Sequence, residues 1–238
     1  TTLLAAHAVP PEYATDREGY LTLVCDQIIP AAVAEGLVDA VDAFCEGIGF
    51  TGEECGRVFE VGARHGLAIR LHADQLSDLG GAALASAYAA RSADHLEYTS
   101  EAGVEAMAES GVTAVVLPGA FYFLGETQVP PIEAFRRHGV PIAVATDLNP
   151  GSSPVASPLA AMNMACVLFG LTPEEALVGM TRNAAPVLGT AGELGTLEVG
   201  SRADVALWSV RHPAELSYWV GSDPCWAVIQ DGSLTHHG

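Results

Sequence analysis

Short apolar runs alternate with segments of helical character over the first two-thirds of the sequence. Thr51 with Glu54 forms a capping box, Ser100 precedes a second helical pattern, and Pro130-Pro131 opens a third. Alternation of this kind is typical of parallel strands joined by helical crossovers. The six apolar runs are residues 3–9, 38–46, 68–73, 92–96, 112–117 and 141–146.

Six such units fit either a doubly wound sheet or part of a (β/α)8 barrel. None of the runs is followed by a Gly-rich phosphate loop, which disfavours a nucleotide-binding sheet. The pattern then changes: residues 195–200 and 203–208 predict short antiparallel strands, and 226–229 leads into an Asp231-Gly232 turn. We predict an α/β fold, in which residues 1–189 form an incomplete (β/α)8 TIM-type barrel and residues 190–238 a small β appendage. The barrel part would hold about six of eight strands.

Charge and cysteine content narrow the range of partners. The chain has 10 basic and 29 acidic residues, a net charge of −19, and half of its residues are apolar. Such a polyanion repels phosphate backbones and anionic lipid, and no apolar run reaches the ~20 residues of a membrane span, so we expect no nucleic-acid or membrane partner. Five cysteines without a CxxC spacing are typical of reduced thiols, so we expect a cytoplasmic protein.

Polar residues collect where the apolar runs end, which in a barrel is the rim that forms the active site. A lone histidine at a strand end is usually structural, but three on one rim favour a metal site. His and Asp suit zinc or iron, and a carboxylate could also take a proton from water at the metal. No GxSxG elbow supports acyl transfer instead. The residues at these ends are His7, Glu46, His72, His95 and Asp147; Glu46 is interpreted as structural.

Five segments carry a resemblance to a known family. They are Ala-His-Ala-Val-Pro-Pro-Glu-Tyr (6–13), His-Ala-Asp-Gln (72–75), Ser-Ala-Asp-His-Leu-Glu (92–97), Ala-Thr-Asp-Leu-Asn-Pro-Gly-Ser-Ser (145–153) and the tail pattern with Gly195, Leu197, Gly200, Ala203 and Asp204. Together they resemble the imidazolonepropionases, the histidine-degradation branch of the amidohydrolase superfamily. The tail pattern is shared by many amidohydrolases, whereas the first four segments together are specific.

The resemblance implies hydrolysis of 4-imidazolone-5-propanoate to N-formimidoyl-L-glutamate with one divalent or trivalent metal ion, zinc or iron. It implies that His72 and Asp147 bind the metal, and that Asp147 is also the catalytic base. His95 would be catalytic beside the attacking water and the substrate carbonyl. Gln75, which is Glu in some relatives, would hydrogen-bond the substrate rather than transfer protons. The residues implied to line the substrate are His7, Gln75, Asn149, Gly151 and Ser152.

The sequence also departs from the family pattern. The His-x-His pair of the first barrel strand and the upstream Arg and Tyr substrate contacts are not found, and His236-His237 is adjacent and terminal. We therefore expect that two barrel strands and the N-terminal half of the β appendage are missing. For the full-length parent we separately expect a homodimer. Two alternatives stay open: another amidohydrolase, such as a nucleobase aminohydrolase, and a catalytically incomplete fragment.

Overall fold

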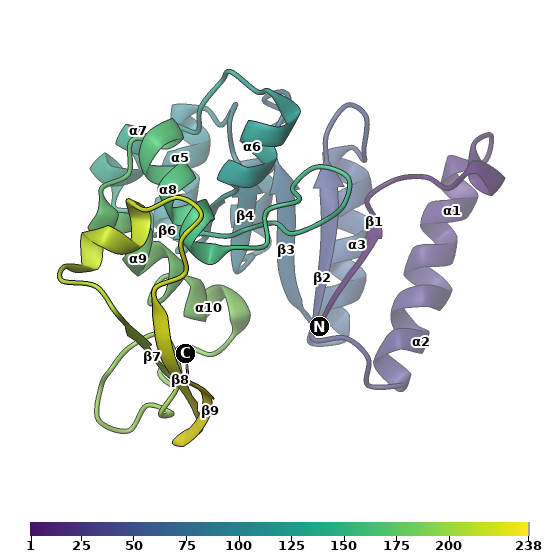
Figure 1. Cartoon of the computed structure of the whole chain (residues 1–238). Helices are drawn as coiled ribbons and strands as arrows, with labels where there is room; N and C mark the ends of the chain where they lie inside the picture. Colours follow the sequence, from purple (N-terminus) through teal and green to yellow (C-terminus); the bar gives the residue numbers. More distant parts are fainter. Residues whose placement is uncertain (238) are drawn as a thin grey trace. The chain divides into compact units, whose positions relative to one another are not determined.

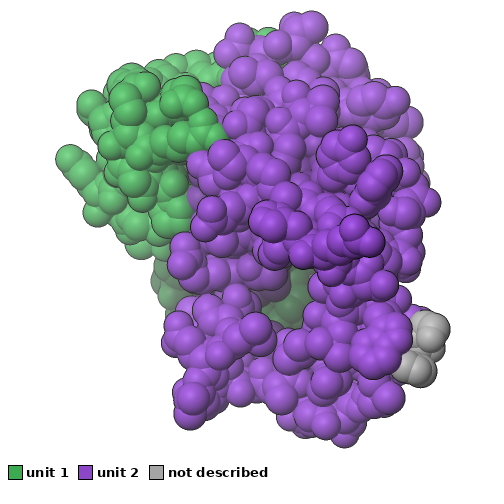
Figure 2. All heavy atoms as spheres, turned by 60° about the vertical axis from the view of Figure 1, so that its left-hand side comes forward, with its two compact units in different colours: residues 1–114, 133–141 green, residues 115–132, 142–238 purple. Residues whose placement is uncertain are grey.

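The computed structural model of the chain describes residues 1–237, which divide into two compact units (Figure 2). Unit 1 comprises residues 1–114 and 133–141, and the described part of unit 2 comprises residues 115–132 and 142–237. Within the described residues, no helix combines the length and the apolar character needed to cross a membrane.

The main sheet has six strands, and each lies beside the strand that precedes it in the sequence, in the order β1-β2-β3-β4-β5-β6 (Figure 1). The pairs β1–β2, β2–β3 and β3–β4 are parallel. This sequential order is that of a (β/α) barrel, because a doubly wound sheet reverses its direction of winding. The strands are β1 (Thr2–Ala6), β2 (Ala40–Cys45), β3 (Ala68–Ala73), β4 (Ser92–His95), β5 (Thr113–Val116) and β6 (Ile142–Val144). The prediction of an incomplete (β/α)8 barrel with six strands is confirmed.

Strand β3 shows how the sheet separates its core from its polar face. Ile69, Leu71 and Ala73 are buried, whereas the residues between them, Arg70 and His72, are partly exposed. Because side chains alternate along a strand, Arg70 and His72 share the face opposite to Ile69 and Leu71. The strand therefore delivers His72 to one face while its other face packs in the core.

Capping residues mark where helices of unit 1 begin and end, as the sequence predicts. Thr51 and Glu54 form the capping box of α3 (Gly52–Arg64), and α5 (Glu101–Ser110) ends at Gly111, whose φ is +78°. Against the sheet, α3 approaches closely: a Cβ on Gly62 would lie 2.5 Å from the Val41 side chain. The other helices here are η1 (Pro11–Tyr13), a 3-10 turn, α4 (Gly81–Ala87) and α7 (Ile132–His138).

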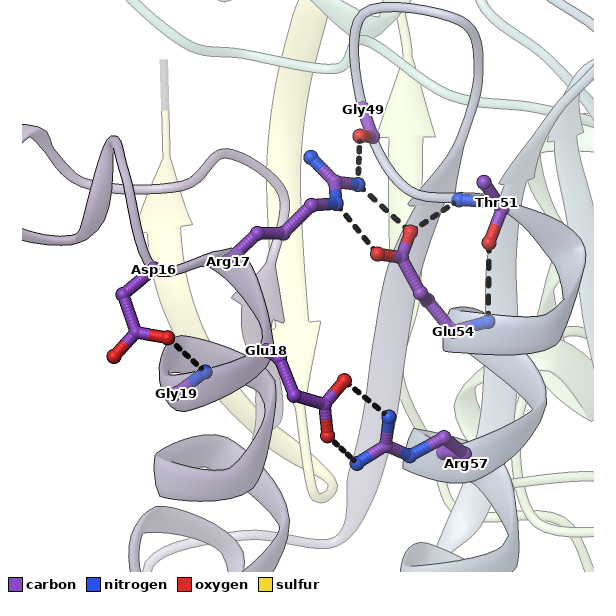
Figure 3. A network of polar contacts seen from close by, with 8 residues as sticks. All are labelled: Asp16, Arg17, Glu18, Gly19, Gly49, Thr51, Glu54 and Arg57. Atoms are coloured by element: carbon purple, nitrogen blue, oxygen red, sulfur yellow. Dashed lines mark hydrogen bonds and ion pairs between the residues drawn. The ribbon is translucent and has the colours of Figure 1, made fainter.

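The helical segment between β1 and β2 was not predicted in detail. It runs through α1 (Arg17–Leu23), a π-helical turn η2 (Val24–Ile28) and α2 (Ile29–Ala34). Pro30 has no N–H to donate and its ring crowds the carbonyl four residues earlier, which accounts for a widened turn at this place. Arg17 fastens α1 to α3 by donating to Glu54 and to the Gly49 carbonyl, and Glu18 pairs with Arg57 (Figure 3).

Unit 2 builds its core from helices around β6. One cluster joins Val115, Leu117, Ala120, Ala143 and Val187. A second joins Leu159, Met162, Ala176 and Leu216. Thr172 and Glu175 form the capping box of α9. The helices are α6 (Pro118–Leu124), α8 (Pro158–Phe169), α9 (Pro173–Met180), α10 (Ala184–Leu188) and the 3-10 helix η3 (Pro213–Ser217).

The C-terminal part of unit 2 forms an antiparallel sheet of β7 (Val205–Trp208), β8 (Cys225–Gln230) and β9 (Ser233–His237). Asp231 and Gly232 both have positive φ, as a two-residue hairpin turn requires. The strand expected at residues 195–200 is absent from the described structure. Gly195 and Gly200 have φ of +84° and +101°, and a Cβ on Gly195 would lie 2.8 Å from the Thr181 carbonyl oxygen. This segment is therefore a loop held close to α9, and its glycines prevent an extended strand.

Candidate active site

The polar residues expected at strand ends do lie at the carboxyl ends of the strands. His7 follows β1, Glu46 follows β2, His72 is the last residue but one of β3, and His95 ends β4. These four belong to unit 1, with Gln75 in the loop after β3. Asp147 follows β6 and belongs to unit 2, together with Asn149, Gly151 and Ser152.

Three histidine rings come together in unit 1. The exposed His7 ring stacks on Phe44, with centroids 5.2 Å apart, and lies 6.1 Å from the His72 ring. The centroids of the His72 and His95 rings are 5.4 Å apart. The parallel pairing of successive strands places these rings side by side, because the ends of neighbouring strands coincide. The structure thus joins three of the predicted site residues in one cluster.

The His72 ring is oriented by a carboxylate in the neighbouring strand. Its Nδ1 lies 3.1 Å from Asp42 Oδ1, and Asp42 is 5% exposed. A carboxylate acceptor favours the tautomer that carries the proton on Nδ1, which leaves the Nε2 lone pair for a metal ion. Asp94 of β4 completes the group, since potential ligand atoms of Asp42, His72 and Asp94 all lie within 4.8 Å of one another. Burial, with Asp42 nearby, raises the pKa of Asp94 to about 6.

His95 differs from His72 in its surroundings. It is 3% exposed, its φ is +78°, and its Nδ1 has no hydrogen-bond partner among the described residues. Burial, with His72 and His7 nearby, lowers the pKa of His95 well below its ordinary value. A strained backbone and an unsatisfied buried nitrogen cost free energy, so they are typical of a residue kept for a function.

Gln75 lies in the loop that follows β3 and is 8% exposed. The residue before it, Asp74, has a φ of +49° and accepts hydrogen bonds from the N–H groups of Gly81 and Ala82 at the start of α4. Gly81 is needed for this approach, because a Cβ there would lie 2.8 Å from the Cβ of Ala73. The direction in which the loop leaves β3 is therefore fixed by its contacts with the start of α4.

In unit 2 the residues after β6 form a tight turn built around Asn149. Its Oδ1 accepts from the N–H groups of Gly151 (2.9 Å) and Ser152 (2.7 Å), and its Nδ2 donates to the Asp147 carbonyl (2.8 Å). Ser153 is fully buried and donates to the Thr146 carbonyl. The Asn149 side chain thus holds Asp147 and Ser152 in one compact loop, in which Asp147 has a φ of +50°.

Sequence reasoning gave no role to Asp42 or Asp94. Both are acidic residues within strands whose other positions are mainly apolar, Ala-Val-Asp-Ala-Phe-Cys and Ser-Ala-Asp-His. Aspartate is depleted in strands and rarely buried without a partner. That contrast could have marked both residues as candidates.

Two observations test whether these residues suit a metal ion. The Asp42–His72 contact has the form of the carboxylate–histidine pair that orients metal ligands in proteins. Among the described residues, Asp42, His72 and Asp94 also each bring one potential ligand atom within 4.8 Å of the others. A second group, Glu101, Glu105 and His138, has similar spacing, but Glu101 is exposed and already pairs with Arg137 and His138. The Asp42–His72 pair therefore fits a role for His72 in holding a metal ion.

Comparison with known proteins adds the family. The model of the amidohydrolase family matches residues 14–235. An imidazolonepropionase of Cupriavidus metallidurans is 57% identical over 238 residues, which are 100% of this chain and 57% of that protein. The imidazolonepropionase of Ectopseudomonas mendocina is 60% identical over 220 residues, which are 92% of this chain and 54% of that protein. The one of Shewanella baltica is 53% identical over 236 residues, which are 99% of this chain and 58% of that protein. The chain thus spans a little over half the length of these curated relatives.

Solved structures agree on the fold. An adenosine deaminase from Xanthomonas campestris with bound zinc gives a TM-score of 0.75 at 19% identity, and the match covers 98% of this chain and 59% of that chain. A triazine hydrolase variant gives a TM-score of 0.77 at 19% identity, again over 98% of this chain and 59% of that chain. At such low identity these similarities concern the fold alone.

Proposed function

The chain belongs to the amidohydrolase family, and from that premise we propose that it carries most of the active site of a metal-dependent hydrolase. The proposed reaction opens the cyclic amide of 4-imidazolone-5-propanoate with water to give N-formimidoyl-L-glutamate. The observation that carries the proposal is the cluster of His7, His72 and His95 at the ends of β1, β3 and β4. The 53–60% identity to imidazolonepropionases along almost the whole chain supports the choice of substrate.

In this proposal His72 and Asp147 bind one zinc or iron ion. Asp42 would hold the His72 ring so that Nε2 faces the ion. The zinc held by the adenosine deaminase of similar fold supports a divalent ion. When bound, the metal would lower the pKa of water from about 16 toward 7, so that hydroxide is available at neutral pH.

The protein groups would handle the proton and the developing charge. The Asp147 carboxylate would take a proton from the attacking water and deliver it to the ring nitrogen as the amide bond breaks. A neutral His95 ring offers one N–H donor, which would hydrogen-bond the substrate carbonyl oxygen as that oxygen gains negative charge. One such contact is typically worth about 3–4 kcal/mol in the transition state.

The remaining predicted residues would bind and orient the substrate. His7 is exposed beside the ring cluster, and Gln75 offers a carboxamide from the loop after β3. Gly151 and Ser152 would line the substrate from the turn that Asn149 holds together. A shell of this kind would distinguish one small-molecule substrate from others that share the same metal chemistry.

A substrate panel tests the proposal with the full-length protein that contains this chain. We expect turnover of imidazolonepropionate and none of guanine, cytosine or hydantoin at a comparable rate. The shell of His7, Gln75, Asn149, Gly151 and Ser152 motivates this choice. Faster turnover of any nucleobase would instead support the aminohydrolase alternative and reject the proposal.

Three further properties are part of the proposal. Elemental analysis of the purified full-length protein decides between zinc and iron, and sedimentation decides whether it is a homodimer. All five cysteines are free and three of them are buried, which fits a reducing compartment such as the cytoplasm. Cell fractionation tests that location.

A further inference from the structure

Glu46 is a buried carboxylate that the proposed reaction does not use. It is 3% exposed and directly follows β2. Its Oε1 accepts from the backbone N–H groups of Leu76 (2.9 Å) and Ser77 (3.1 Å), and its Oε2 accepts from the Ser77 hydroxyl (2.7 Å). Oε2 also accepts from the N–H of Gly47 at 3.1 Å. Three of these hydrogen bonds therefore join β2 to the loop after β3.

The loop itself does not need a buried carboxylate for its N–H groups. Leu76 is 38% exposed, so the loop reaches the surface, where water can bond to backbone N–H groups. Burying a carboxylate is costly unless several donors surround it. A carboxylate with three bonds to one loop restricts that loop to a single conformation, which water would not do. The arrangement therefore indicates a demand for precise loop geometry.

The other side of the same loop is fixed in a comparable way. The Asp74 carboxylate accepts from the N–H groups of Gly81 (2.8 Å) and Ala82 (3.0 Å) and from the Thr99 hydroxyl (3.0 Å). The N–H of Tyr98 donates to the Asp74 carbonyl at 2.8 Å. Asp74 thus ties the start of the loop to α4 and to the segment after β4.

Gln75 is the one residue between these two anchored points. The hydrogen bonds of Asp74 and Glu46 engage backbone groups and the hydroxyls of Thr99 and Ser77, and none of them uses the Gln75 carboxamide. We propose that Glu46 is a positioning residue which, opposite Asp74, fixes the loop so that the Gln75 carboxamide is aligned for the substrate. This inference rests on the substrate contact of Gln75 in the proposed function.

The inference predicts how variants of Glu46 behave in the full-length protein. Glu46→Ala removes all four acceptor contacts, and a displacement of about 1 Å in a positioned group can cost about 10²-fold in rate. We expect kcat/KM for imidazolonepropionate to fall by about 10–10²-fold. Glu46→Gln keeps one oxygen for the N–H groups of Leu76 and Ser77, so it should recover most of that loss.

A double-mutant cycle separates positioning from general destabilisation. If Glu46 acts through Gln75, then Glu46→Ala should cost little more once Gln75→Ala is present, because residues that act as one unit are not additive. Val58→Ala is the matched control: it removes buried apolar volume from α3, and Val58 takes no part in the loop hydrogen bonds. It should lower thermal stability and leave kcat/KM unchanged.

Hydrogen exchange supplies a readout that does not depend on activity. In Glu46→Ala, but not in Val58→Ala, the amides of Leu76 and Ser77 should exchange faster. If the amides exchange faster in Glu46→Ala but the wild-type protein does not turn over imidazolonepropionate, the inference that Glu46 holds the loop would stand. The proposed function would then be rejected, and with it the role of the loop in catalysis. Unchanged exchange, or losses in kcat/KM that add fully with those of Gln75→Ala, would overturn the inference itself.

Discussion

His72 and His95 lie 5.4 Å apart, ring centroid to centroid, yet their surroundings suit them to different tasks. Asp42 holds Nδ1 of His72, as is typical of a metal ligand. His95 is buried, has an unsatisfied Nδ1, and has a pKa lowered by burial and by its neighbours. A buried imidazole with a lowered pKa and no hydrogen bond at Nδ1 suits a hydrogen bond to the substrate better than a bond to a metal ion.

This difference predicts distinct effects of two substitutions in the full-length protein. His95→Ala should keep most of the metal while kcat falls by about 10²–10³-fold, as for the loss of one transition-state contact. Asp147→Asn should lose metal and activity together, because its carboxylate would be both ligand and base. Metal content and steady-state kinetics measured on the same preparations distinguish the two.

His65→Ala provides the control for both substitutions. His65 is exposed at the end of α3, where a cation interacts favourably with the helix dipole. It should change neither metal content nor kcat. A His95→Ala protein as poor in metal as Asp147→Asn would make His95 a ligand and contradict the roles proposed here.

At the scale of elements, the contact between α1 and α3 predicts a pH dependence of stability (Figure 3). The Arg17 hydrogen bond and the capping bond from Thr51 lower the pKa of Glu54 from 4.5 to about 2. Because the folded-state pKa is lowered, the unfolded chain binds the proton first as pH falls. The stabilisation is therefore complete above about pH 4.5 and is lost as the pH falls toward 2.

Urea unfolding of the full-length protein between pH 7 and pH 3 measures this effect. Glu54→Gln should be less stable than wild type near neutrality, and the difference in free energy of unfolding should shrink below about pH 4.5. Glu53→Gln, an exposed neighbour in the same helical turn, is the matched control and should show no such convergence. A constant gap for Glu54→Gln across the range would refute the linkage.

The elements also show how far the sequence predicts the fold. The Thr51–Glu54 capping box and Ser100 located the starts of α3 and α5 well, because those signals depend on local geometry. The apolar runs extend beyond the ends of the strands, because hydrophobicity indicates burial and not hydrogen-bonded strand pairing. Leu96 and Leu117, for example, are buried but lie just beyond β4 and β5. At residues 195–200 the alternating pattern was overridden by the positive φ of Gly195 and Gly200.

The candidate site was predictable to a similar degree. Strand ends and resemblance identified His7, His72 and His95, and the structure brings these three together. Contacts of Asp42 and Glu46 were not predictable, because they depend on which residues of neighbouring strands and loops come opposite one another. The register between neighbouring strands depends on the whole sheet, so the periodicity along one strand does not predict it.

At the scale of the whole molecule, the described residues leave strand edges and apolar side chains exposed. Strands β1 and β6 end the strand order of the main sheet, and unpaired strand edges promote association. Within unit 2, Leu197, Val199 and Trp226 are more than half exposed near the small sheet. A cavity of about 700 Å³ there is lined by apolar side chains that include Met162, Met180 and Trp208.

We therefore predict that the 238-residue chain, expressed alone, aggregates, binds metal substoichiometrically and shows no hydrolysis above background. His72 and Asp147 supply two proposed ligands, whereas catalytic zinc usually has three protein ligands and a water. Weak binding would leave the water poorly activated. Adding the segment that precedes this chain in full-length relatives, in trans or by fusion, should prevent aggregation and restore stoichiometric metal binding and hydrolysis. Metal analysis and an imidazolonepropionate assay on monodisperse protein measure these effects. One equivalent of metal with normal turnover in the 238-residue chain would show that the site has been misplaced.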